Sequence, residues 1–239
     1  GKIEFSKVSF RYMQSAEPAL VNLDFVVNPG QIVAVTGADG AGKSTLFKLV
    51  LGLYQPQAGA ILVDDIDSRQ FNPTELRRMI GYMPEERARF FRATITQNMR
   101  LVRPDASLED ILEAIDMAGG LSQIERLPGK LDYRSGDHRQ DLTFTTRKKL
   151  SLARAYLTRA PILLLDDPTA GLDEQTAQKF EKVLQALKGK ATVLFATHQM
   201  SQIVLADVLM VLDKGVIRAM GTPQELLQRP VQAAGAGAN

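Results

Sequence analysis

A glycine-rich loop constrains the fold of this chain more than any other feature of its sequence. Residues 37–45 fit the pattern G-x-x-x-x-G-K-[ST], directly after an aliphatic run at residues 32–36 and before a helical pattern. Glycine is needed because backbone N–H groups must approach a phosphate closely, and a Cβ atom would clash. An incidental glycine-rich turn would not explain the flanking strand and helix. The sequence therefore predicts a phosphate-binding loop, the P-loop, formed by Gly37, Ala38, Asp39, Gly40, Ala41, Gly42, Lys43, Ser44 and Thr45.

The end of this loop indicates a nucleoside triphosphate and a magnesium ion as ligands. The N-terminus of the following helix presents its positive end to the same anion. We expect Lys43 to reach the β- and γ-phosphates and the Ser44 hydroxyl to ligate Mg²⁺. ATP and Mg²⁺ are the predicted ligands, and Lys43 is a predicted catalytic residue.

Two adjacent carboxylates follow a second buried strand. Four aliphatic residues at 162–165 precede Asp166 and Asp167, which places both acids at the carboxyl end of the strand, where ligands bind in open α/β sheets. Asp166 is the predicted metal ligand beside Ser44. Asp167 is the predicted general base or water-positioning residue. The alternative is an acidic turn before a proline.

A histidine ends a third strand pattern. The β-rich run at residues 192–197 delivers His198 at its end. Because this strand belongs to the same predicted sheet, we interpret His198 as a γ-phosphate contact and a catalytic residue. The alternative is an ordinary surface or core histidine.

The order of patterns along the chain predicts the fold class. β-rich sequence comes first, and strands then alternate with helices, which favours a largely parallel sheet covered by helices. We expect an α/β fold with a P-loop NTPase core, an N-terminal antiparallel β subdomain and an inserted helical subdomain. Strand patterns occupy residues 2–9, 21–27, 31–36, 60–63, 80–83, 162–166, 192–196, 207–212 and 216–220, and helix patterns occupy residues 43–51, 108–117, 147–157, 173–187 and 223–227.

The predicted organisation is one ATP-binding domain over residues 1–239. Residues from about 1 to 93 and 160 to 230 form the β subdomain and the core, and residues from about 94 to 159 form the helical subdomain. The Ala/Gly-rich residues 231–239 form a flexible tail. The abrupt start on a strand pattern favours the hypothesis that the chain is cut from a longer protein.

Composition excludes several classes of protein. The formal charge of +2 argues against a basic nucleic-acid surface, and the basic runs at residues 87–92 and 147–149 are interpreted as solvated faces. The absence of cysteine excludes disulfides and thiolate metal sites. No apolar run approaches the roughly 18 to 20 residues that span a bilayer.

Together the three motifs resemble the nucleotide-binding domain of an ABC transporter, and the resemblance covers residues 3–229. It implies that Tyr12 stacks on adenine and that residues 170–173, with Asp173, form a loop at the dimer interface. Residues 91–99, 127–129 and 136–139 resemble the exporter branch, in which this domain follows six membrane helices. The resemblance further implies a head-to-tail dimer with two ATP molecules, at the inner face of the cell membrane.

The signature segment departs from the pattern of this family. The family places the serine of Leu-Ser-Gly-Gly-Gln 23 residues before the strand-end aspartate, and that position is Thr143 here. The signature and dimer-interface segment is therefore Leu142, Thr143, Phe144, Thr145 and Thr146. Side chains in place of the two glycines should weaken the contact with a γ-phosphate. The alternative is that Thr145 or Thr146 simply caps the following helix.

Two further departures concern the hydrolytic site. Asp167 stands where the family usually has glutamate, which withdraws the carboxylate by roughly 1.5 Å. Glu85 stands where a glutamine normally contacts Mg²⁺ and the membrane domain, so Glu85 is a predicted metal ligand that adds negative charge. We expect intact ATP binding and slow hydrolysis.

These features favour a slow Mg-ATPase domain that powers or gates an exporter. The expected partners are a transmembrane domain, in the same polypeptide or a separate subunit, and a second nucleotide-binding domain, identical or not. Two alternatives stay open: an ATP-binding regulatory clamp with negligible hydrolysis, and a soluble non-transport ABC ATPase. No nucleic-acid partner is expected.

Overall fold

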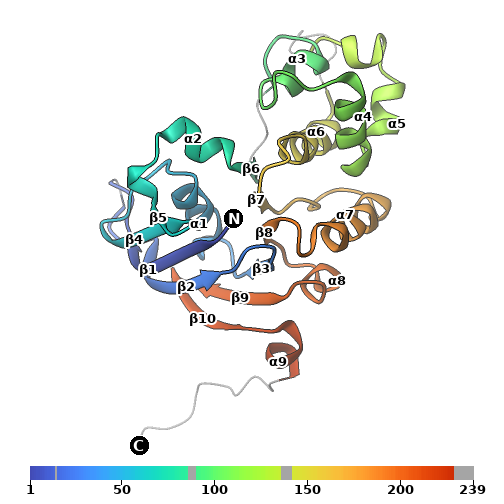
Figure 1. The fold of residues 1–239 in the computed structure, drawn as a ribbon. Helices are drawn as coiled ribbons and strands as arrows, with labels where there is room; N and C mark the ends of the chain where they lie inside the picture. The colour runs from blue at the N-terminus through green and yellow to red at the C-terminus, as the bar shows by residue number, and fades with distance from the viewer. Residues whose placement is uncertain (14, 86–89, 136–141, 229–239) are drawn as a thin grey trace, which may run out of the picture.

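A computed structural model describes residues 1–13, 15–85, 90–135 and 142–228 of the chain. The predicted tail at residues 231–239 and the exporter-like motif at residues 136–139 lie outside the described residues. Figure 1 shows two sheets in the lower half of the molecule and a group of helices above them. Among the described residues, no helix combines the length and apolar character needed to cross a membrane.

The first sheet is antiparallel. Its strand order is β2-β1-β4-β5, and both neighbours of β1 run antiparallel to it. Alternate residues of β1 and β2 are buried, as expected for a sheet with one face on a core. The predicted N-terminal antiparallel sheet is confirmed, with bounds β1 (Ile3–Phe10), β2 (Leu20–Val27), β4 (Ala58–Val63) and β5 (Ile66–Asp67).

The second sheet is mainly parallel. Its order is β10-β9-β3-β8-β7-β6, and only the β10–β9 pair is antiparallel. This sheet confirms the predicted core. Its strands are β3 (Ile32–Thr36), β6 (Ile80–Met83), β7 (Ile162–Asp166), β8 (Thr192–Ala196), β9 (Val208–Asp213) and β10 (Val216–Gly221).

The unbroken aliphatic runs of the central strands fill two separate cores. In β7, Leu163 and Leu165 pack into the core shared with the helical region, whereas Ile162 and Leu164 pack into the core shared with the antiparallel sheet. Successive side chains of a strand point to opposite faces, so a strand buried on both faces must be apolar throughout. The parallel sheet is therefore the middle layer of the molecule.

The helices agree with the predicted ones in part. Helix α4 has the predicted bounds, but α6 begins at Phe144 instead of residue 147, because Thr143 caps it. Helices α2, α3, α5 and α8 were not predicted individually. The helices are α1 (Lys43–Val50), α2 (Pro73–Arg78), α3 (Ile95–Arg100), α4 (Leu108–Met117), α5 (Leu121–Glu125), α6 (Phe144–Leu157), α7 (Glu174–Leu187), α8 (Met200–Ile203) and α9 (Pro223–Gln228), with short 3₁₀ turns η1 (Ser68–Gln70) and η2 (Lys130–Asp132).

Helices α3 to α6 lie between β6 and β7 in the chain and form the upper group in Figure 1. Two of them start with a capping box, formed by Thr94 with Gln97 at α3 and by Ser107 with Asp110 at α4. This is the region for which the sequence predicted an inserted helical subdomain. We propose boundaries for it near residues 94 and 159.

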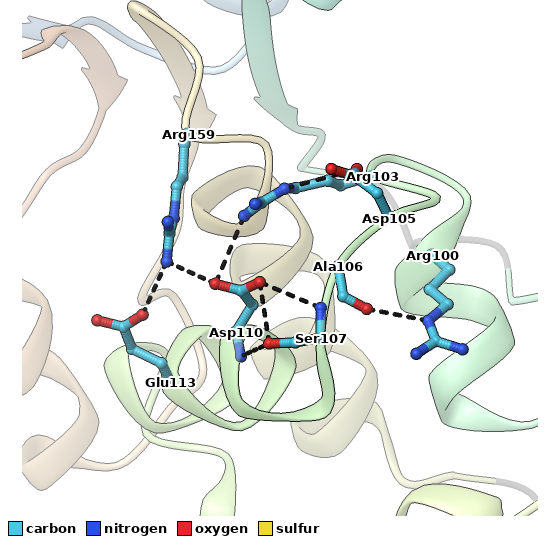
Figure 2. Close-up of polar contacts among 8 residues, drawn as sticks. All are labelled: Arg100, Arg103, Asp105, Ala106, Ser107, Asp110, Glu113 and Arg159. Atoms are coloured by element: carbon cyan, nitrogen blue, oxygen red, sulfur yellow. Dashed lines mark hydrogen bonds and ion pairs between the residues drawn. The ribbon is translucent and has the colours of Figure 1, made fainter.

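A charged cluster connects α4 to the chain just before β7 (Figure 2). The Arg159 guanidinium donates to Asp110 Oδ1 at 2.7 Å and to Glu113 Oε2 at 3.1 Å. Arg103 pairs with the same oxygen of Asp110 at 3.6 Å. Hydrogen bonds from the backbone and side chain of Ser107 hold the pKa of Asp110 below its usual value. Pairs of this kind stabilise little individually, and here Asp110 and Arg159 each take part in two of them.

A buried amide holds the start of the helical region together. Asn98 is fully buried, its Oδ1 accepts from Phe91 N at 2.9 Å, and its Nδ2 donates to Phe91 O and Thr94 O. Arg154 of α6 donates to the same Oδ1 at 3.0 Å. The segment before α3 is therefore fixed to α6 through one side chain.

Replacing Asn98 with Ala should lower the free energy of unfolding by about 2–3 kcal/mol, because buried partners would be left unsatisfied. Chemical denaturation followed by circular dichroism measures this change. Gln178→Ala, at an exposed site on α7, is the control and should stay within about 0.5 kcal/mol of the unmodified chain. Equal stability of the Asn98 variant would contradict the role of this amide.

Candidate functional site

The phosphate loop lies between β3 and α1, and two of its glycines are required by packing. Gly37 has φ +155°, and a Cβ atom there would lie 2.2 Å from Leu212 O. Gly42 has φ +108°, and a Cβ atom there would lie 2.7 Å from Leu20 Cδ2. Backbone that approaches other atoms so closely tolerates only glycine. The path of the loop is therefore set by its contacts with β9 and β2.

Lys43 is the first residue of α1 and is 7% exposed. Its Nζ donates to Gly37 O at 2.7 Å and to Ala38 O at 3.2 Å, and it lies 3.5 Å from His198 Nε2. Charged acceptors form stronger hydrogen bonds than carbonyls do. A phosphate bound in the loop would therefore compete for the same ammonium group.

Strand register brings the predicted carboxylate to the same place. Val35 of β3 and Asp166 of β7 both pair with Ala196 of β8, so the three strands end side by side. His198 follows Ala196 by two residues. The three motifs that are far apart in the sequence therefore meet at the carboxyl edge of the parallel sheet.

Asp166 is the residue of this edge that most clearly lacks a partner. It is 1% exposed, and neither carboxylate oxygen has a hydrogen-bond partner. Burial raises the pKa of Asp166 to about 6; the nearby Ser44 hydroxyl opposes this rise although its geometry falls short of a hydrogen bond, and the charges of Glu85 and Asp167 add to it. A buried carboxylate without a partner is destabilising. A cation beside Asp166 would remove this cost.

These residues fit a magnesium ion that is completed by a phosphate. The described ranges contain no group of three or more His, Cys, Asp or Glu side chains able to hold a metal ion by themselves. Mg²⁺ is usually bound by one or two protein oxygens together with substrate phosphates and water. Asp166 and Ser44 supply that number of oxygens, and Glu85 lies close enough to act electrostatically on Asp166.

Asp167 and His198 lie on neighbouring loops that are joined by a buried amide. Asp167 has a positive φ of +47°, and its N–H donates to Ala196 O at 3.2 Å. Gln202 is fully buried; its Nε2 donates to Thr169 Oγ1 at 2.7 Å, and its Oε1 accepts from Thr197 Oγ1 at 2.9 Å. This bridge ties the residue before His198 to the loop after Asp167. No sequence pattern indicated a role for Gln202.

Tyr12 lies beside the helix that follows the phosphate loop. Its hydroxyl is 3.1 Å from Thr45 Oγ1, and its ring packs edge-on against Phe10 and Tyr54. The ring is half-buried, so one part of it remains accessible. The predicted stacking of Tyr12 on adenine stays a prediction.

The segment at residues 142–146 starts α6. Thr143 caps the helix, because its Oγ1 accepts from Thr146 N at 3.2 Å. The alternative in which Thr145 or Thr146 is the cap is therefore wrong. The Phe144 ring is 46% exposed. No hydrogen bond between described residues joins this segment to the phosphate loop of the same chain. Its place at the interface of a head-to-tail dimer stays a prediction.

Asp173 caps α7 and is already engaged within the chain. Its Oδ1 accepts from Thr176 N at 2.9 Å, and its Oδ2 pairs with Lys149 Nζ at 3.0 Å. The hydrogen bond from Lys149 is the main reason that the pKa of Asp173 is lowered to about 2. The predicted place of Asp173 at a dimer interface stays a prediction.

The interpretation of residues 147–149 as a solvated face is wrong for two of the three residues. Lys148 is 8% exposed and Lys149 is 3% exposed. Lys148 Nζ donates to Ala170 O at 2.6 Å, so both lysines bind the segment that follows Asp167. A lysine with a long apolar stem can lie along a core while its charge binds a carbonyl or carboxylate. The run at residues 87–92 lies partly outside the described residues.

Comparison with known proteins identifies relatives over nearly the whole chain. Residues 20–170 match the family described as "ABC transporter". A β-(1→2)glucan export ATP-binding/permease protein of Rhodopseudomonas palustris (strain BisB18) is 39% identical over 230 residues, which cover 96% of this chain and 38% of that protein. An ATP-dependent lipid A-core flippase of Chromobacterium violaceum is 34% identical over 229 residues, covering 96% of this chain and 39% of the flippase.

A solved structure supports the same assignment. It is the structure of a bacterial Atm1-family ABC exporter with ATP bound, which is 32% identical and superposes with a TM-score of 0.87. The match covers 95% of this chain and 39% of that one. The chain thus spans about two fifths of the length of these relatives.

Replacing Asp166 with Asn should stabilise the nucleotide-free chain, because the neutral amide removes a buried charge. The folded-state pKa of about 6 lies above the usual 3.8, so the native state binds the proton more tightly. Stability is therefore lost as pH rises from about 4 to about 6, and the loss approaches roughly 3 kcal/mol at neutral pH.

Urea denaturation in the presence of a chelator tests this expectation. The stability gain of Asp166→Asn should be about 1 kcal/mol larger at pH 7.5 than at pH 5. The reverse order, or a loss of stability at pH 7.5, would show that Asp166 is already compensated in the empty site.

Proposed function

Because this chain belongs to the ABC transporter family and is an ATP-binding domain of the exporter type, we propose that it binds Mg-ATP, hydrolyses it slowly and thereby powers or gates an exporter through nucleotide-dependent dimerisation. One observation carries the proposal: Lys43, the unpartnered Asp166 and His198 meet at one edge of the parallel sheet. That arrangement suits a triphosphate with its metal ion and does not suit a neutral ligand.

Each residue has a part in the proposed reaction. Loop N–H groups and Lys43 hold the phosphates and stabilise the charge that develops on the transferred phosphoryl group. Asp166 and Ser44, with Glu85, would hold Mg²⁺, which neutralises phosphate charge when bound. Asp167 accepts a proton from the attacking water, and His198 contacts the γ-phosphate.

Three features support slow turnover. Asp167 has a shorter side chain than glutamate, and a misplacement of about 1 Å can lower a rate on the order of a hundredfold. Phe144 and Thr145 place side chains at the start of α6, where an approaching phosphate would otherwise meet backbone. Glu85 adds a negative charge next to Asp166. In a homodimer both sites would carry all three features, whereas an ordinary partner would leave each site with only part of them.

A regulatory clamp with negligible hydrolysis is the second candidate. The Thr143 oxygen is used inside its own helix, which leaves it less available to a phosphate on a partner chain. In this function ATP would stabilise the closed dimer without being cleaved.

The chain has a surface that suits the proposed membrane partner. A cleft of about 700 Å³ lies between the α1–α2 region and the α3–α6 region, and its lining includes Leu53, Leu101 and Val102. These three side chains are 48%, 56% and 41% exposed. Exposed apolar side chains around a cleft favour docking of an apolar helix or loop. We propose that the transmembrane domain of the exporter, in the same polypeptide or another subunit, docks here and places the chain at the inner face of the membrane.

Replacing Lys43 with Ala should reduce ATP affinity by at least about a hundredfold, because the ammonium group is the main positive side chain at the phosphates. Isothermal titration with ATP measures the affinity. Lys182→Ala, at an exposed lysine on α7, is the matched control and should bind ATP as the unmodified chain does. If the Lys43 variant binds ATP with the affinity of the unmodified chain, the assignment of the phosphate site is wrong.

Replacing Asp167 with Glu should raise Mg-ATP turnover by about tenfold or more, because the longer side chain carries the carboxylate closer to the attacking water. Phosphate release in single- and multiple-turnover assays measures the change. Asp167→Asn should release no phosphate. Unmodified turnover already as fast as that of Asp167→Glu would contradict the slow-site proposal.

A further inference from the structure

Lys148 is a nearly buried lysine close to the predicted hydrolytic residues. It lies in the second turn of α6, is 8% exposed, and its Nζ donates to Ala170 O at 2.6 Å. Burying an ammonium group is costly unless the charge finds compensation. One neutral carbonyl compensates little, so the surroundings of Lys148 must supply more.

Three carboxylates supply that compensation. Burial lowers the pKa of Lys148, and the charges of Asp167, Glu85 and Asp166, in this order, partly oppose this shift. Two of the three, Asp167 and Glu85, are the residues at which this chain departs from the pattern of its family. Of these two, only Glu85 adds a negative charge relative to the family pattern, and its charge acts on Lys148.

The start of α6 also holds the segment after Asp167 at three successive points. A Cβ atom added at Gly171 would lie 3.5 Å from Cε1 of the Phe144 ring, and Lys148 Nζ is 5.9 Å from the centre of that ring. Lys148 binds Ala170, and Lys149 binds Asp173. Of these contacts, the hydrogen bond from Lys148 to Ala170 is closest in sequence to Asp167. The Lys148 ammonium group is also attracted electrostatically by the Asp167 carboxylate.

We propose that Lys148 is a positioning residue of the ATP site, which ties the segment after Asp167 to α6 and offsets the charge of Glu85 and Asp167 opposite the bound triphosphate. This inference rests on the proposed function, because it requires a triphosphate at the edge of the sheet. A purely structural lysine would hold Ala170 but would not be coupled to Glu85.

A double-mutant cycle separates these roles. Lys148→Met keeps the length and apolar stem of the side chain but removes its charge and its hydrogen-bond donor. Lys148→Arg keeps the charge and a donor. Each is made in the unmodified chain and together with Glu85→Gln, and circular dichroism confirms folding. The affinity for ATP is measured by titration calorimetry in the presence of a chelator, where no metal ion can mask the carboxylates.

The expected result is a loss of metal-free ATP affinity of about three- to tenfold in Lys148→Met, since one charge at this range in a partly screened site has that order of effect. The loss should shrink to less than about twofold when Glu85→Gln is also present, which is the sign of direct coupling. Lys148→Arg and the exposed control Lys182→Met should stay within about twofold. Equal losses with and without Glu85→Gln would overturn the proposed charge compensation.

Hydrogen–deuterium exchange tests the tether independently of ATP. The backbone amides of residues 169–173 should exchange at least about fivefold faster in Lys148→Met than in Lys148→Arg. Identical exchange would overturn the tether. If the unmodified chain binds no ATP at all, the proposed function fails; if it binds ATP through Lys43 but is indifferent to Lys148, only this inference fails.

Discussion

The structure depends on the register of three buried parallel strands. β3, β8 and β7 are apolar on both faces because each packs into two cores, so a slip by one residue would move every side chain from one core to the other and disrupt the packing of both. Val35, Ala196 and Asp166 consequently lie in one row at the carboxyl edge. The phosphate loop, the buried carboxylate and the histidine take their positions from this row.

That constraint explains which parts of the molecule could be predicted from the sequence. Three strands of the parallel sheet, Ile80–Met83, Ile162–Asp166 and Thr192–Ala196, have the predicted bounds, because short apolar runs bounded by polar residues identify buried strands. The positions of Asp166 and His198 at strand ends could be predicted from these strands. Short helices such as α2, α5 and α8 have too few turns to show a period, and the tertiary packing that stabilises them leaves no local pattern.

The predictions failed where a polar residue has a role that only the fold reveals. Lys148 and Lys149 form part of a basic run, and a run of charges suggests a solvated surface, yet both side chains fold inward against the segment after Asp167. The Thr143 hydroxyl lies 2.8 Å from Thr146 Oγ1 and accepts from Thr146 N at 3.2 Å, so it caps its own helix, and a contact with a phosphate stays a prediction. The lysines bind groups that are distant in sequence, and the threonine binds a residue of its own helix. Residue type alone predicts neither choice of partner.

Gln202 gives the hydrolytic edge a mechanical property of its own. Its single amide group holds Thr169 on one side and Thr197 on the other, and its complete burial leaves no water to take over either bond. The loop that carries Asp167 and the loop that carries His198 cannot relax separately without stranding a polar group in the core. The two loops are therefore coupled through Gln202, so a ligand that displaces either loop must break one of these two hydrogen bonds or move the other loop with it.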